Sequence, residues 1–317
     1  MKILFTSIAT LLASTFLPIN DSNTTPKNNL NYISDNYYVG VYKADSLFIK
    51  GDYEKSYTIL DDLFKEFTPV NMEIYNEYKT YVKASYIAGN ASETFQHFKN
   101  LITTYGISWK QITHDNVLNT IAKENDFVLE DYNQLKNTFD SHVDNALVTE
   151  IKSLKEKLNF YRNLEKLNDA SMKIKIVNFK KEYLQRIESI LNKNGYPSIS
   201  ETGKSSKNAY IDLQDDFYML LQNISDEGLK NNILPTLKTL VAKGECDPKI
   251  YAKLYDYHLS KESHQQKFGT ITFDSEDHIQ NKDSINIYRK SIGLPSYGYE
   301  SWRFKNLHPV DYKKINP

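Results

Sequence analysis

The sequence contains few of the residues that make turns. It has 11 glycines and 9 prolines among 317 residues, about 6% together, where an average globular protein has roughly 12%. This scarcity disfavours a barrel or sandwich of many short strands, which needs frequent turns. A single cysteine, Cys246, excludes an intrachain disulfide framework and a zinc site built from several cysteines. We therefore predict a mainly α-helical protein.

The chain also lacks an excess of charge of either sign. Lysine and arginine total 39, aspartate and glutamate total 40, and the formal net charge is −1. No global electrostatic attraction to nucleic acid or to an acidic membrane surface is expected, so a partner must be selected by local features. We predict no nucleic-acid partner and, since no cofactor motif is present, no cofactor. Hydrophobic residues make up 40% and aromatic residues 13%, which is enough to form a sizeable core.

The N-terminus has the layout of a secretory signal peptide. Lys2 precedes an uncharged, mostly apolar stretch over residues 3–19, and the chain turns polar at Asn20. We predict an exported protein, periplasmic or extracellular, with residues 1–20 as the signal peptide. Cleavage after Ala13 and cleavage near Asn20 both remain open. An uncleaved N-terminal membrane anchor and a buried N-terminal helix are the alternatives.

Residues 21–35 are rich in asparagine, serine and threonine and are predicted to form a flexible lead-in. After them, no apolar run is long enough to cross a bilayer, so no membrane span is expected in the mature chain.

Residues 36–145 contain an internal repeat. Gly51 and Gly89 lie 38 positions apart (89 − 51), and aligning them places apolar residues of one unit on apolar residues of the next. The aligned pairs are Tyr57 with Phe95, Leu60 with Phe98, Leu63 with Leu101, Phe64 with Ile102 and Phe67 with Tyr105. Each unit predicts two helices that share an apolar seam and meet at a glycine with positive φ. Residues 107–145 are expected to add a less regular helical pair.

Residues 42–56 resemble the tetratricopeptide repeat, with an aromatic, a small residue and an apolar pair followed by Gly-Asp-Tyr-Glu-Lys-Ser. The second unit departs from the pattern at Ala91, where an aromatic is usual, and the spacing exceeds the usual 34 residues. In that family, stacked helix pairs form a concave surface that binds proteins or peptides. The resemblance implies such a docking surface. The alternative is that the two pairs only cap the rest of the molecule.

Residues 147–193 contain no glycine or proline and keep helical apolar spacing, which predicts two long helices separated near Asn168 and Asp169. Their mixed charges are typical of a solvated face, and we see no basic stripe suited to phosphate groups. Gly195 and Pro197 should end the second helix.

The region 146–317 is predicted to be a helical domain with a small extended or β element. Ser225 can cap a helix that ends at Gly244, and Asp247 with Pro248 can begin another. Alternating apolar residues over 265–273 then favour a short strand or an extended arm.

The order of short motifs over residues 150–300 resembles an uncharacterised bacterial domain family, domain of unknown function 6624. The matching motifs are Gly-Tyr-Pro at 195–197, the segment from Tyr210 to Gln214, Leu-Pro at 234–235, Gly244, Asp256, Gln-Lys-Phe-Gly-Thr at 266–270, and Arg289 with Gly293 and Leu294. The chain departs from the family at four polar positions, which would remove part of any activity that those groups carry. These are Asp215 for histidine, Tyr257 for arginine, Phe268 for tyrosine and Ile271 for glutamine.

The resemblance implies that several polar residues share one domain and form a candidate site. The candidates are Gln214, Asp256, Gln266, Gly269, Thr270 and Arg289. Asp256 and Arg289 could pair, and a buried pair of this kind is either a structural staple or part of a ligand pocket. The histidines lack metal-ligand spacing, so no metal site is predicted. Cys246 is interpreted as a passive turn residue.

These patterns predict a protein- or peptide-binding scaffold that acts through its helical repeats. The alternative is a small-ligand-binding or hydrolase-like protein that uses the C-terminal domain, and whether the chain is an enzyme stays open.

Overall fold

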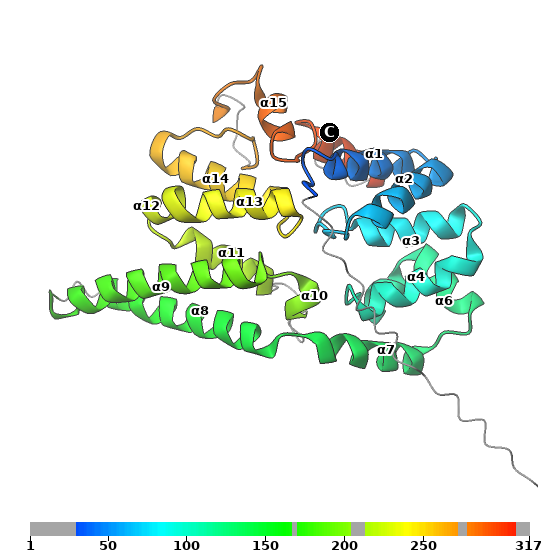
Figure 1. Ribbon diagram of the computed structural model, residues 1–317, viewed down its shortest axis with the longest axis horizontal. Helices are drawn as coiled ribbons and strands as arrows, with labels where there is room; N and C mark the ends of the chain where they lie inside the picture. Colours follow the sequence, from blue (N-terminus) through cyan, green and yellow to red (C-terminus); the bar gives the residue numbers. More distant parts are fainter. Residues whose placement is uncertain (1–29, 167–169, 204–212, 272–277, 309–317) are drawn as a thin grey trace, which may run out of the picture. The chain divides into compact units, whose positions relative to one another are not determined.

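Two helical hairpins with glycine corners begin the folded chain (Figure 1). The computed structural model describes residues 30–166, 170–203, 213–271 and 278–308. The first hairpin pairs α1 (Tyr37–Ile49) with α2 (Tyr53–Glu66), and the second pairs α3 (Glu77–Ile87) with α4 (Ala91–Thr103). Gly51 and Gly89 both have a φ of +85°, and a Cβ at either would meet open space. Backbone conformation, and not close packing, therefore favours glycine at the two predicted corners.

Residues 107–145 form three short helices where a single irregular pair was expected. They are α5 (Trp109–His114), α6 (Asn116–Glu124) and α7 (Leu129–His142). Asp115 separates the first two because its side chain accepts hydrogen bonds from the backbone N–H groups of Val117 and Leu118 and so caps α6.

The two long helices predicted over residues 147–193 are present, and they pack as an antiparallel hairpin. They are α8 (Asn145–Lys166) and α9 (Lys173–Asn194), with a short 3-10 turn, Ala170–Met172, before α9. Residues 168 and 169, where the break was expected, lie outside the described residues. Tyr161 stacks on Phe179 across the seam with ring centroids 4.0 Å apart. Gly195, with a φ of 73°, follows the last residue of α9.

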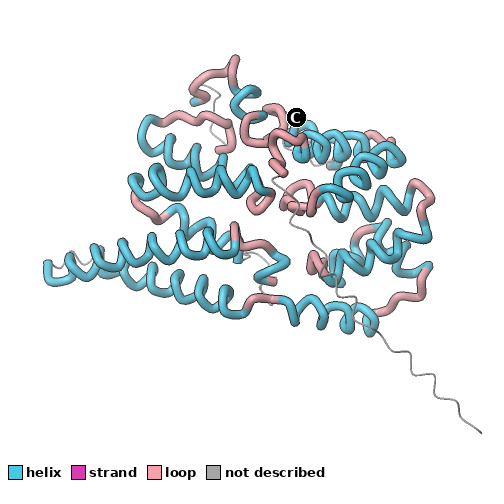
Figure 2. The backbone as a smooth tube through the Cα atoms, in the orientation of Figure 1, coloured by secondary structure: helices cyan, strands magenta, loops and turns pink. Residues whose placement is uncertain are grey.

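The remaining helices complete the fold (Figure 2). They are α10 (Ile199–Thr202), α11 (Leu213–Gln222), α12 (Asp226–Gly228), α13 (Leu234–Lys243), α14 (Pro248–Ser263), α15 (Ile285–Lys290) and α16 (Tyr299–Leu307). Ser225 caps α12 as expected, and a π-helical turn, Leu229–Ile233, joins it to α13. Pro235 lies in the first turn of α13, where its missing N–H is tolerated. Asp247 caps α14.

The expected strand over residues 265–273 is reduced to one bridge. Gln266 pairs in parallel with Ile279 in an isolated bridge, and the described residues contain no regular strand. The amide side chain of Gln266 instead bonds both backbone groups of Ile271 and closes a loop on itself. Residues 272–277 lie outside the described part.

The folded part begins earlier than predicted, because residues 31–35 form a turn and not a flexible lead-in. The Tyr32 ring is buried against Tyr37 and Phe67, and its backbone N–H donates to the carbonyl of Ala242 at 2.8 Å. Asn31–Pro317 form one compact unit, so the boundary expected near residue 145 marks a change of pattern and not a division between separately packed domains. Among the described residues, no helix is long and apolar enough to cross a membrane.

The first helix is buried on two faces. Its Tyr37 hydroxyl bonds Glu77 of α3, within the repeats. A second face of α1 contacts the C-terminal part of the chain through Tyr38, Tyr42 and Asp45. The Tyr38 hydroxyl donates to the carbonyl of Val241 at 2.7 Å, that of Tyr42 donates to Gly293 at 2.7 Å, and Arg303 binds both oxygens of Asp45. The C-terminal part of the chain therefore covers this face of α1. This contact is of the kind expected if the helix pairs cap the rest of the molecule.

Replacing Tyr42 with phenylalanine should lower the free energy of unfolding by about 1 kcal/mol, because the buried carbonyl of Gly293 loses its donor. Urea unfolding followed by circular dichroism measures the change. Tyr53→Phe, at a partly exposed tyrosine of the same hairpin, is the control and should change stability less. Equal effects of the two substitutions would contradict the assigned contact.

Candidate functional site

Asp256 organises a loop of the C-terminal part. It lies on α14 with none of its surface exposed. Its Oδ1 accepts hydrogen bonds from the backbone N–H groups of Lys267 at 2.8 Å and Phe268 at 3.0 Å. Its Oδ2 accepts from Thr270 twice, from the backbone N–H at 2.9 Å and from the hydroxyl at 2.7 Å. The carboxylate thus replaces the hydrogen-bond partners that a strand would supply to this loop.

Arg289 holds the same loop from its other side. Its Nη1 donates to the carbonyl of Phe268 at 2.6 Å and its Nε to the carbonyl of Pro295 at 2.7 Å. The ion pair expected between Asp256 and Arg289 is therefore replaced by an indirect link. Asp256 binds the N–H of Phe268, and Arg289 binds the carbonyl of that residue.

The structure brings five of the six predicted site residues together and buries three of them, whereas Gly269 and Thr270 are partly exposed. Asp256, Gln266 and Arg289 are at most 4% exposed, and their polar atoms bond the loop from residue 266 to 271 and the carbonyl of Pro295. Gly269 makes the tight turn of the loop with a φ of 64°. This arrangement matches the staple interpretation, because Asp256, Gln266 and Arg289 are buried and bond backbone groups of the chain.

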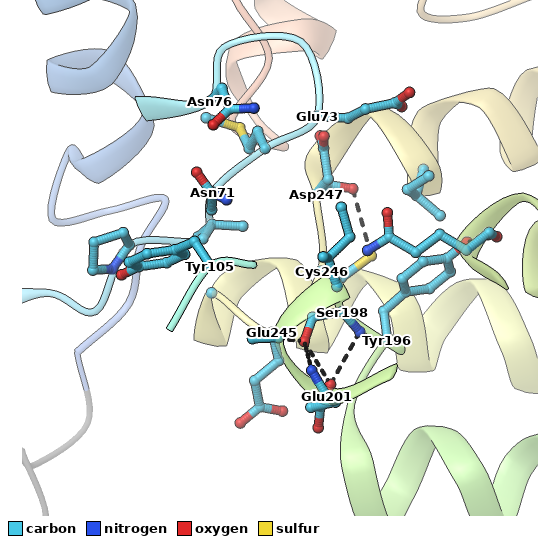
Figure 3. Close-up of a pocket in the computed structure, with 18 of the residues that line it drawn as sticks. Asn71, Glu73, Asn76, Tyr105, Tyr196, Ser198, Glu201, Glu245, Cys246 and Asp247 are labelled. Atoms are coloured by element: carbon cyan, nitrogen blue, oxygen red, sulfur yellow. Dashed lines mark hydrogen bonds between the residues drawn. The ribbon is translucent and has the colours of Figure 1, made fainter. Parts of the chain in front are cut away.

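The sixth candidate, Gln214, lies elsewhere. Its side chain donates to the carbonyl of Pro197 at 3.2 Å and lines a cavity of about 470 Å³ (Figure 3). Loops from both halves of the chain form the cavity wall, and none of the other five candidates belongs to it. The wall residues are Pro69, Val70, Asn71, Met72, Glu73, Asn76, Tyr105, Gln111, Asn194, Tyr196, Ser198, Ile199, Ser200, Glu201, Gln214, Asp215, Gly244, Glu245, Cys246, Asp247 and Ile250.

The cavity wall is acidic. Among the residues that the structure describes, it includes five carboxylates and no lysine or arginine. The five are Glu73, Glu201, Asp215, Glu245 and Asp247. In Figure 3, Glu73 lies on the loop between α2 and α3, and Glu245 and Asp247 lie on the facing loop between α13 and α14. A cavity with this lining favours positively charged groups.

The carboxylates of the wall differ in their surroundings. Glu201 closes a capping box with Ser198. Asp247 accepts the backbone N–H of Lys249 at 2.8 Å. Burial, together with repulsion from Glu73 and Glu300, raises the pKa of Asp247 to about 6, against the opposing effect of Lys249. A cation in the cavity would relieve this cost and favour the ionised form.

A buried glutamate supports the loop that carries Asn71 and Glu73. Glu77 is 1% exposed, and its Oε1 accepts from the Tyr37 hydroxyl at 2.9 Å and from the backbone N–H of Asn71. Burial raises the pKa of Glu77 to about 7. Within the described part of the chain, the Oδ1 of Asn71 and the Oε2 of Glu77 are buried without a hydrogen-bond donor. The φ of Asn71 is +54°, and that of Asn76 is +48°, so the loop is held in a left-handed conformation at two points.

Cys246 is a structural residue of the cavity wall. It is 3% exposed, and its thiol donates to the carbonyl of Asp247 at 3.4 Å. Burial, with a contribution from the charge of Asp247, raises the pKa of this thiol well above its usual range. The thiolate needed for nucleophilic chemistry is therefore disfavoured. Among the described residues, no three or more His, Cys, Asp or Glu side chains are grouped so as to hold a metal ion.

The sequence indicated a few residues of the cavity wall but not that the wall is acidic. Gln214, Gly244 and Cys246 had been singled out individually, but the five carboxylates are spread from residue 73 to residue 247. No local spacing connects them, because the fold alone brings their loops together.

Comparisons with family models, with curated proteins and with solved structures each found no match. The resemblances to the tetratricopeptide repeat and to domain of unknown function 6624 therefore rest on the sequence patterns alone.

Proposed function

We propose that the protein is a binding protein whose acidic cavity receives a cationic group, a lysine or arginine side chain of a partner protein or peptide. The observation that carries this proposal is a wall to which the described part of the chain contributes five carboxylates and no lysine or arginine. A cationic side chain would gain Coulomb energy from several carboxylates at once, and partial burial reduces the screening of that attraction by water.

The dimensions and the aromatic residues of the cavity support a side chain as its occupant. A volume of about 470 Å³ lies within the range of small-ligand sites. Tyr105 and Tyr196 contribute aromatic rings to the wall, and such rings favour ammonium and guanidinium groups. A partner bound here would contact both the loop of the helical repeats and the loops of the C-terminal part. This retains the predicted peptide-binding role and moves it from the concave face of the helical repeats to the cavity.

The hydrolase-like alternative receives less support. Asp256, Gln266 and Arg289 bond backbone groups of loops, and Cys246 favours the protonated thiol. None of these groups is then available to act on a substrate.

We also propose that the protein is exported, because residues 1–20 have the layout of a signal peptide. This segment lies outside the described residues. Mass spectrometry of the protein recovered outside the cytoplasm should give an N-terminus between residues 14 and 21. An intact N-terminus on a protein that stays in the cell membrane would favour the anchor instead.

Removing two carboxylates of the wall should weaken binding of a lysine peptide about tenfold or more, which corresponds to about 1.4 kcal/mol. The peptide alternates lysine and glycine, and a peptide with glutamine in place of lysine is its neutral counterpart. The variant is Glu73→Gln with Glu245→Gln, both at exposed positions of the wall where loss of charge should not affect folding. Isothermal titration calorimetry measures the affinities at low and high salt, and the lysine peptide should bind more tightly at low salt.

The matched control is Glu130→Gln with Glu156→Gln, which makes the same change of net charge at exposed positions outside the cavity wall. This control should bind the lysine peptide like the unmodified protein. Equal affinity for the lysine and glutamine peptides, or equal weakening by both double variants, would contradict the proposal.

A further inference from the structure

The end of the long helical hairpin exposes large apolar side chains to solvent. Phe160 on α8 is 59% exposed, and Ile174 and Val177 on α9 are 75% and 65% exposed. All three belong to the end of the hairpin where α8 stops and α9 begins (Figure 1). Exposed apolar groups gathered in one place are a feature of interaction sites.

These side chains are not part of the seam between the two helices. Tyr161 and Phe179 stack in that seam, and Phe179 is 7% exposed. Val177 lies two positions before Phe179, about 200° away around a helix, and Ile174 shares the face of Val177. The seam therefore does not need Phe160, Ile174 and Val177, and these exposed apolar groups have no partner among the described residues of the hairpin.

The same end of the hairpin is strongly basic. Residues 157–181 contain seven lysines and arginines and two acidic residues, a net charge of +5 (7 − 2), in a chain whose net charge is −1. All seven basic residues are exposed. They are Lys157, Arg162, Lys166, Lys173, Lys175, Lys180 and Lys181. Of the two acidic residues, Glu165 binds Lys180 at 2.6 Å. Positive charge is therefore concentrated at this end of the hairpin, although basic and acidic residues are mixed along the sequence of the two helices.

We propose that this end of the α8–α9 hairpin docks on a bilayer rich in anionic phospholipid. Phe160, Ile174 and Val177 enter the interface, and the surrounding lysines and arginines bind lipid phosphate groups. Long basic side chains suit this role, because their apolar stems can lie along the acyl region while their charges reach the headgroups.

A lipid surface fits the geometry better than an acidic protein. The exposed apolar residues come from both helices, and each has basic residues nearby in the chain, such as Lys173 and Lys175 on either side of Ile174. A fluid bilayer can surround the end of a hairpin from several sides. A folded protein partner would need a surface shaped to both helices, whereas a bilayer needs none.

The docking site is separate from the acidic cavity. Asn194 at the last turn of α9 lines the cavity, whereas Ile174 and Val177 lie in the first two turns of the same 22-residue helix. The helix rises 1.5 Å per residue, so about 30 Å separates the two ends. Bilayer docking of the hairpin would therefore leave the cavity free to bind, and the two proposals stand or fall independently.

The test is co-sedimentation of the full chain with vesicles of phosphatidylcholine containing phosphatidylglycerol, or of phosphatidylcholine alone. The unmodified protein should bind the anionic vesicles at least tenfold more strongly. Ile174→Ser with Val177→Ser, and separately Lys173→Gln with Lys175→Gln, should each reduce partitioning to anionic vesicles at least tenfold. Leu129→Ser with Ile287→Ser is the control, since both residues are exposed outside the hairpin. It should bind like the unmodified protein.

The comparison within one full-length chain cancels any contribution of the N-terminal apolar segment, which all variants share. Unchanged partitioning of both hairpin variants overturns the proposal. A second outcome would also overturn the proposal. If light scattering shows that the hairpin variants lose self-association while they still bind lipid, a second copy of the chain covers the hairpin. Binding to polyglutamate that the serine variant retains, without binding to vesicles, would assign the hairpin to an acidic protein and also overturn the proposal.

Discussion

Replacing Asp256 with alanine is expected to lower the free energy of unfolding by about 3–5 kcal/mol. Three backbone N–H groups, one buried and two partly buried, lose their acceptor together with the hydroxyl of Thr270, and Arg289 loses a nearby opposite charge. Asp256→Asn keeps the shape and one acceptor oxygen, so we expect a smaller loss. Urea unfolding followed by circular dichroism measures both variants.

The local consequence gives a second measurement. Hydrogen exchange of the amides of Lys267, Phe268 and Thr270 should accelerate strongly in Asp256→Ala, because the loop opens once its acceptor is gone. Asp62→Ala, at an exposed position on α2, serves as the control and should leave this exchange unchanged. A stability equal to or above that of the unmodified protein would contradict the staple, because strained functional groups are the ones whose removal stabilises.

Replacing Glu77 with glutamine should remove a decline in stability with rising pH that amounts to about 3 kcal/mol. The pKa of Glu77 rises from its ordinary 4.5 to about 7 because the side chain is buried. Below pH 4.5 the group is protonated in both the folded and unfolded chain. Between pH 4.5 and pH 7 only the unfolded chain releases the proton, so stability falls as pH rises. Above pH 7 the effect is complete.

Glutamine preserves the acceptor that Tyr37 and Asn71 use, so the variant should keep the fold and the loop. In urea unfolding from pH 4 to pH 8, the free energy of unfolding of the variant should rise relative to that of the unmodified protein as the pH increases. Glu130→Gln, at an exposed carboxylate, is the control and should follow the unmodified protein. Because Asp247 also titrates in this range, the difference between curves, and not either curve alone, carries the result. Parallel curves for Glu77→Gln and the unmodified protein would contradict the prediction.

The hairpins could be predicted because their signals are local. Gly51 and Gly89 mark corners, Ser225 and Asp247 mark helix starts, and each acts within a few residues of its own position. Apolar spacing identified α8 and α9 for the same reason. The turn at Tyr32 escaped prediction because a polar sequence surrounds it and its contacts lie on α13 and the first hairpin.

The sequence predicted where the candidate site of the C-terminal part lies. It did not decide whether these residues form a structural staple or a ligand pocket. Motif order indicated that Asp256, Gln266 and Arg289 share a region, and they do. Their partners are backbone N–H and carbonyl groups, which every residue carries and which no side-chain pattern reveals. The sequence allowed a direct ion pair between Asp256 and Arg289, and the structure links the two residues through the backbone of Phe268 instead.

The acidic cavity and the basic hairpin end depend on folding in three dimensions. Glu73 and Asp247 are far apart in the chain and meet at one cavity. Arg162 and Lys175 belong to different helices, α8 and α9, which the fold places side by side in an antiparallel hairpin. Net charge along the sequence conceals both features, since opposite local excesses cancel in a total of −1.

The contacts of the first helix set the order of events on the ribosome. The hydrogen-bond partner of Tyr38 is synthesised 203 residues later, that of Tyr42 251 residues later, and that of Asp45 258 residues later. At roughly 5–20 residues per second, translation takes about 12–50 seconds to deliver the last of them. Throughout that interval the nascent hairpin displays an uncovered tyrosine face, a natural target for chaperones that bind emerging chains.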